Sequence, residues 1–189
     1  MPDTPTMSFE LNEEMLNIIE DEFSPEKIAS RLAEAVKGKS PEEVDRIGGE
    51  LFLQYGADLM KRSYALGEEY MDRTYEVIRE AAERTGSFTF PLIPQRFIEI
   101  AYLSTQHIGT LPVMVNNANE LIFQIKECKI YEQIKTKAGE DIARKLTCKS
   151  GCLKACETIF SQFEFNDVSI GMNAATNRDG YCEFRITRN

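Results

Sequence analysis

The residues best equipped for chemistry are five cysteines, and all of them lie in the last third of this 189-residue chain: Cys128, Cys148, Cys152, Cys156 and Cys182. A thiolate is a nucleophile and a ligand for soft metals, whereas a buried thiol behaves as a small hydrophobic group. An odd number of cysteines in a chain without a secretory signal favours free thiols, metal ligands or redox chemistry over disulfides. We therefore expect the function to depend on this C-terminal third.

Three of the cysteines follow one another at intervals of four residues, which places neighbours on one face of a helix. On a straight helix the outer pair, Cys148 and Cys156, would be about 12 Å apart at ~1.5 Å per residue, so one ion cannot bind all three. Gly151 instead favours a helix that begins nearby, with Cys148 in the lead-in and Cys152 in the first turn. The exposed N–H groups there would lower the pKa of the Cys152 thiol.

Two hypotheses and an alternative follow from these thiols. A tetrahedral zinc site or an iron–sulfur cluster would use four of them, with Cys156 left outside; the four are Cys128, Cys148, Cys152 and Cys182. A single reactive thiol is the second hypothesis, and inert core thiols are the alternative.

Other polar residues give weaker evidence of a functional site. His107, the only histidine, is expected at a helix end and far from any cysteine in the sequence, which favours capping or packing over a ligand or catalytic role. Acidic residues crowd the segment 68–80, but the Glu-x-x-His motif of di-metal carboxylate sites is absent. We interpret that segment as a solvated face. The acids are Glu68, Glu69, Asp72, Glu76 and Glu80.

Hydrophobic periodicity predicts helices first and strands later. Helices are expected over 9–23, 25–36, 41–84, 94–108, 131–146 (with an interruption at Gly139) and 150–163. Strands are expected over 87–92, 111–116, 120–126, 167–175 and 181–187. The fold class is therefore α+β, with N-terminal helices followed by an antiparallel sheet of four to five strands and two inserted helices. Residues 1–86 would form a helical region and residues 87–189 an α+β ligand-binding domain, together one compact unit.

Two local features bear on the site. Gly48, Gly49 and Gly56 weaken the long helix, since each interior glycine costs roughly 1 kcal/mol relative to alanine; they predict either a break or a close helix–helix approach. In the final strand, alternation places Cys182 on the core side with Phe184.

Composition excludes several classes of partner. The net charge of −9 argues against nucleic acid, because phosphate binding needs a basic face. No apolar run approaches the ~20 residues of a membrane span. The first residues carry neither a basic nor an apolar signal-peptide region, so a cytoplasmic location is expected.

Residues 180–186, Gly-Tyr-Cys-Glu-Phe-Arg-Ile, resemble the closing signature Gly-x-x-Cys-x-Phe-x-Ile of the 4-vinyl-reductase or hydrocarbon-binding domain family. The order of elements before it is also similar: a strand ending at Cys128, a helix, the segment from Cys148 to Cys152, another helix and two strands. Cys182-Glu183-Phe184-Arg185 is also similar to the closing Cys-Asp-Phe-Arg of the L-2-amino-thiazoline-4-carboxylic acid hydrolase family. The resemblance covers residues 110–187.

The resemblance implies an α+β domain that forms a homodimer, encloses a small apolar ligand and carries a structural zinc bound by cysteines. Zinc-binding members have Glu-x-x-Cys shortly before the closing cysteine, whereas residues 171–174 here are Gly-Met-Asn-Ala. The missing donors would have to come from Cys128, Cys148 or Cys152.

Three functions are therefore open. The first is a ligand-binding or sensory module with a cysteine-based metal or redox site, whose pocket aromatic residues line; these are Tyr64, Tyr70, Phe97 and Tyr102. The second is a hydrolase of a small sulfur- or nitrogen-containing ring, with Cys148 or Cys152 as nucleophile or metal ligand and Glu127 or Glu157 carrying protons. The third is an accessory protein that binds partners through its N-terminal helices.

Overall fold

The structure of the chain is a computed structural model, and it describes residues 14–70, 95–117 and 119–188. The expected strand 87–92 and the second half of the long helix, beyond residue 70, lie outside the described residues. So do three of the five clustered acids. Of the other two, Glu68 pairs with Arg96 at 3.1 Å and Glu69 is exposed.

The helices in the described parts of the chain are α1 (Glu14–Glu22), α2 (Pro25–Val36), α3 (Pro41–Glu69), α5 (Gln95–Thr105), α6 (Lys129–Ala138), α7 (Glu140–Arg144), α8 (Lys149–Gln162) and α9 (Thr176–Asp179). Their starts follow the sequence signals. Ser40 begins α3 in a capping box with Glu43, in which each residue bonds the backbone N–H of the other. Gly139, at a φ of 97°, divides the expected helix 131–146 into α6 and α7.

Four strands form one antiparallel sheet in the order β1-β2-β4-β3. They are β1 (Val113–Asn116), β2 (Glu120–Ile125), β3 (Val168–Ala174) and β4 (Cys182–Arg188). The predicted α+β class is confirmed. The sequence predicted four to five strands, and the sheet in the described residues has four. Two helices were expected between β2 and β3. The described residues there form three, because Gly139 divides the first into α6 and α7. None of the described helices is both long and apolar enough to cross a membrane.

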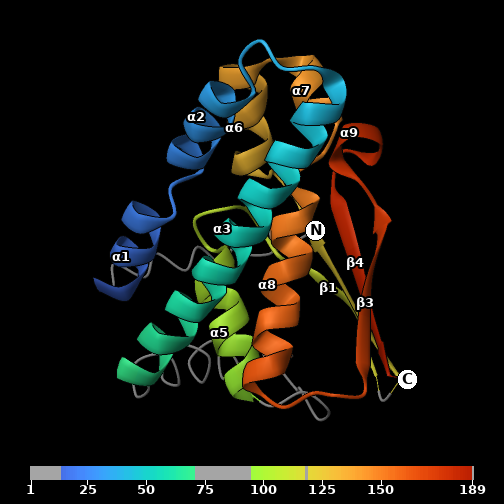
Figure 1. Ribbon diagram of the computed structural model, residues 1–189. Helices are drawn as coiled ribbons and strands as arrows, with labels where there is room; N and C mark the ends of the chain where they lie inside the picture. Colours follow the sequence, from blue (N-terminus) through green and yellow to red (C-terminus); the bar gives the residue numbers. More distant parts are fainter. Residues whose placement is uncertain (1–13, 71–94, 118, 189) are drawn as a thin grey trace, which may run out of the picture.

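The helices cover one face of the sheet, and α3 and α8 run side by side within that layer (Figure 1). Phe123 of β2 lies opposite Phe184 of β4, and Ile125 lies opposite Cys182. The two phenylalanine rings stack with their centroids 5.3 Å apart. Cys182 is 7% exposed, so it lies on the core face of the sheet, as its alternation predicts.

The glycines of α3 mark a close helix–helix approach and not a break, because α3 is continuous from Pro41 to Glu69. A Cβ atom on Gly56 would overlap the carbonyl of Gly151 in α8, and one on Gly48 would lie 2.7 Å from Thr147 Oγ1. The missing side chains thus let the backbones of α3 and α8 touch. This contact fixes the position of α8 relative to the sheet.

Candidate functional site

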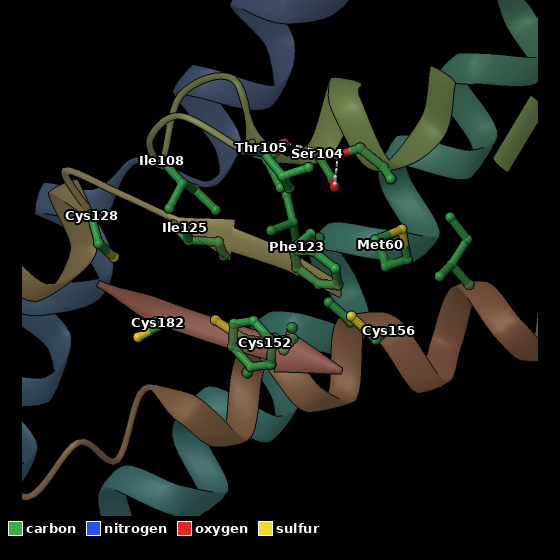
Figure 2. A pocket seen from close by; sticks show the side chains of 18 of the residues that line it. Met60, Ser104, Thr105, Ile108, Phe123, Ile125, Cys128, Cys152, Cys156 and Cys182 are labelled. Carbon is green, nitrogen blue, oxygen red and sulfur yellow. Dashed lines mark hydrogen bonds between the residues drawn. The ribbon is translucent and has the colours of Figure 1, made fainter. Parts of the chain in front are cut away.

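A cavity of about 480 Å³, partly open to solvent, lies between the helical layer and the sheet (Figure 2). Its walls come from α3, α5, α6, α8, α9, β1, β2 and β4. Most of the lining is apolar, and the sheet contributes Leu121, Phe123, Ile125, Phe184 and Ile186. Such a volume lies in the ~300–1,000 Å³ range of pockets that hold small molecules.

The cavity exists because α8 presents small side chains to the sheet. Cys148, Cys152 and Cys156 repeat every four residues, and Gly151 and Ala155 lie beside them on the same wall. A helix that presented leucine or phenylalanine at these positions would fill the space. The Gly56 contact prevents α8 from collapsing onto the sheet, since it holds α8 against α3 on the other side.

All five cysteines line this cavity. Cys148 and Cys182 are buried, and Cys128, Cys152 and Cys156 are partly exposed. Figure 2 shows four of the thiols around the cavity, on α8, on β4 and at the start of α6. Cys156, which the predicted metal site leaves out, lines the same wall as Cys152.

The thiols carry raised pKa values, which corrects the expectation of a lowered one at Cys152. Burial raises the pKa of Cys128 to about 11 and that of Cys156 to about 12. It raises the pKa values of Cys148 and Cys152 further, and neighbouring thiols add to the effect. Cys152 is in the first turn of α8, but its backbone N–H already bonds the Cys148 carbonyl at 3.4 Å. At neutral pH these groups are therefore neutral thiols.

The thiols interact electrostatically, since the charge of each of the other four would raise the pKa of Cys152. Among the described residues, however, no group of three or more His, Cys, Asp or Glu side chains is placed to hold a metal ion. The geometry therefore does not by itself form a zinc or cluster site. The four-cysteine site stays a prediction, which metal analysis of the purified protein tests.

The four aromatic residues predicted to line a pocket separate into two pairs. Phe97 and Tyr102 of α5 line the cavity. Tyr64 lies outside its lining and packs edge-on against Phe163 at 6.0 Å between ring centroids, and Tyr70 also lies outside. Tyr55 is a lining aromatic that the sequence did not single out, although its place on the apolar stripe of α3 is a usable signal.

His107 does not line the cavity. It is 6% exposed, and its Nε2 lies 3.2 Å from the carbonyl oxygen of Phe23, to which it donates. The Tyr55 hydroxyl donates to the same carbonyl at 2.7 Å. Burial lowers the pKa of His107 to about 4, so the ring is neutral and packs between elements, as the sequence favoured.

The two carboxylates considered as proton carriers also lie away from the cavity. Glu157 is exposed and pairs with Lys154 at 3.2 Å, and Glu127 is exposed. Neither lines the cavity, and no Asp or Glu of the described residues does. Comparison of the chain with protein families, with curated proteins and with solved structures gives no match.

Proposed function

We propose that this chain binds a small, largely apolar molecule in the cavity between α3, α5, α8 and the sheet. The observation that carries the proposal is an apolar space of about 480 Å³ with a wall of small residues on α8. Sites for small molecules are concave and mostly apolar with a few polar groups in the wall, and this lining has that composition. Homodimerisation and a cytoplasmic location belong to the same proposal.

The chemistry of the lining favours binding over catalysis. A hydrolase would need an activated nucleophile and a group to carry protons. Here burial raises the pKa of every candidate nucleophilic thiol, and the only histidine is neutral and outside the lining. The heterocycle hydrolase and the accessory protein remain alternatives that no contact in the described residues favours.

Organic extraction of freshly purified protein, followed by mass spectrometry, tests the proposal directly. A stoichiometric lipophilic molecule is expected. The extracted protein should then bind N-phenyl-1-naphthylamine, a neutral fluorescent probe, at about one per chain. Light scattering in the same preparation measures the oligomeric state.

A pair of variants on α8 connects binding to this cavity. Ala155→Phe places a ring in the space and should weaken probe binding at least tenfold, since Ala155 lines the wall. Ser161→Phe makes a similar change at an exposed position of the same helix, away from the lining, and should leave the affinity unchanged. Equal affinity in both folded variants, or no probe binding in the extracted wild type, would overturn the proposal.

A further inference from the structure

One buried polar atom in the cavity wall has no hydrogen-bond partner. Three such side-chain atoms occur among the described residues, namely Ser63 Oγ, His107 Nδ1 and Asn116 Oδ1. Of the three residues only Asn116 lines the cavity. A buried acceptor left without a donor costs about 1–3 kcal/mol, so an unpartnered amide in an apolar wall calls for a ligand that satisfies it.

The backbone directs Asn116 to this wall. Asn116 ends β1 and lies directly opposite Leu121 of β2, and opposite residues of an antiparallel pair share a face. That face is the core face, because Leu121 lines the cavity. A shift in register between Val113 and Val115 puts Val113 on the same face, opposite Phe123.

The turn after β1 does not explain the amide of Asn116. Asn117 forms the turn, since its Oδ1 accepts from the backbone N–H groups of Asn119 and Glu120 at 2.9 and 3.1 Å. A structural role in the hairpin is therefore already filled by the next residue. An apolar side chain at position 116 would pack on this face equally well.

Three other hydroxyls in the lining are engaged within the protein. Ser104 and Thr105 each donate to the Ala101 carbonyl, at 2.8 and 2.9 Å. The Tyr55 hydroxyl donates to the Phe23 carbonyl at 2.7 Å. Asn116, which can turn about χ2 and offer either its oxygen or its NH₂ group, is thus the polar group best placed to bind a ligand.

The lining also constrains the shape of the ligand. Inward-facing residues of β2 run from Leu121 to Ile125, about 13 Å at ~3.3 Å per residue. Lining residues of α8 run from Cys148 to Ile159, about 16 Å at ~1.5 Å per residue. The cavity is therefore elongated. Asn116 lies at the Leu121 end, and Cys182, opposite Ile125, lies at the other.

Charge restricts the ligand further. Lys149, an exposed residue at the start of α8, is the only charged residue in the described lining. It adjoins Cys148, at the end of the cavity away from Asn116. The thiols are neutral, so no group of the described lining at the Asn116 end would pair with an ionised ligand. Burial of an unpaired charge is strongly unfavourable.

We propose that the ligand is an elongated, uncharged and mostly hydrocarbon molecule whose single polar end group, such as an alcohol, donates a hydrogen bond to Asn116 Oδ1 while its apolar end lies among the cysteines. At the roughly 30 Å³ that a water molecule occupies in the liquid, the cavity holds on the order of 16 non-hydrogen atoms. This proposal rests on the proposed function and adds the class of ligand and its anchor.

The test is displacement of N-phenyl-1-naphthylamine from extracted protein at pH 7.5 by 1-dodecanol, dodecane and dodecanoate. In wild type, dodecanol should bind at least tenfold more tightly than dodecanoate, because the carboxylate would be buried unpaired. Asn116→Leu should weaken dodecanol by about 2- to 10-fold, the value of a neutral hydrogen bond, and leave dodecane unchanged.

Leu121→Met is the matched control, since it keeps volume at the position opposite Asn116 and should alter dodecanol and dodecane equally. Equal losses for both ligands in Asn116→Leu, or dodecanoate as tight as dodecanol in wild type, would overturn the anchor while probe binding still supports the cavity. Absence of all binding in wild type would overturn the proposed function itself.

A spectroscopic readout covers the case in which Asn116→Leu does not fold. The side-chain NH₂ resonances of Asn116 in ¹⁵N-labelled wild type should shift with dodecanol and not with dodecane. Equal shifts with the two ligands would contradict the hydrogen bond.

Discussion

At the residue scale, the cysteines show two opposing effects on a thiol, and Cys128 shows both at once. It is the N-cap of α6, and the backbone N–H groups of Ile130 and Tyr131 lower its pKa. Burial acts in the other direction and prevails, so the pKa rises from 9.0 to about 11. A helix N-terminus is worth up to about 2 kcal/mol, whereas a two-unit rise is about 3 kcal/mol. Position at a helix start does not make a thiol reactive when burial outweighs the effect of the N–H groups.

This balance predicts slow alkylation. At pH 8 a thiol with a pKa near 11 is about one part in a thousand thiolate, roughly 100-fold less than one with a pKa of 9. Iodoacetamide should therefore label Cys128, Cys148, Cys152 and Cys156 at least tenfold more slowly in the native protein than in urea. Peptide mass spectrometry over time measures each rate.

Bound ligand should slow the native labelling further, because the thiols line the cavity. Rapid native labelling of Cys148 or Cys152 at pH 8 would contradict the raised pKa values and would favour the hydrolase alternative. Labelling after organic extraction provides the ligand-free comparison.

At the element scale, local signals in the sequence were sufficient for most of the fold. Ser40 with Glu43 predicts the start of α3, Gly139 predicts the interruption, and alternation predicts β3 and β4. These signals depend on residues a few positions apart. The glycines of α3 are different, because the choice between a break and a close approach depends on Gly151, which is about a hundred residues away in the sequence.

The contact between α3 and α8 makes a stability prediction. Gly56→Ala should destabilise the protein by about 3 kcal/mol, because the new methyl group meets the Gly151 backbone, which cannot turn aside as a side chain would. Gly49→Ala is the control in the same helix. Its nearest neighbour, Ser150 Oγ, is 4.0 Å away, so alanine should stabilise by up to about 1 kcal/mol.

Urea unfolding followed by circular dichroism measures both variants. Both variants gain the higher helix propensity of alanine. The difference between their free energies of unfolding therefore reports the packing at Gly56. If Gly56→Ala and Gly49→Ala are equally stable, α3 and α8 can separate without loss of stability. The contact between these helices would then not explain the position of the α8 wall of the cavity.

At the scale of the whole molecule, the cavity could not be predicted from the sequence. Eight elements of the described chain contribute to it, and its lining runs from Phe52 to Ile186. The sequence did not single out Asn116, and it gave Tyr64 and Phe97 the same standing as pocket candidates. Only the packing of the folded chain shows that Asn116 and Phe97 line the cavity and that Tyr64 does not. The repeat of small residues over 148–156 was the one local signal, and the sequence also allowed a metal site there.

The attachment of the N-terminal helices also depends on residues that are far apart in the sequence. The Phe23 carbonyl, at the end of α1, accepts from Tyr55 of α3 and from His107 after α5. Three segments far apart in the sequence therefore meet at one buried acceptor. His107 must remain neutral there, since burial opposes its charge.

This junction makes folding sensitive to acid. The unfolded histidine takes up a proton near pH 6.5, and the folded one near pH 4. Between these values the unfolded state binds more protons, so stability falls as the pH is lowered. His107→Gln keeps a donor and cannot titrate. Between pH 7 and pH 4.5 the wild type should lose on the order of 2 to 3 kcal/mol more than this variant.

Urea midpoints at the two pH values measure the difference. Tyr55→Phe is the control, because it removes the other bond to the Phe23 carbonyl without removing a group that titrates in this range. Its loss of stability should be similar at both pH values, about 1 kcal/mol for one neutral hydrogen bond. If wild type and His107→Gln lose equal stability on acidification, His107 is not the buried neutral group that ties the N-terminal helices to the cavity wall.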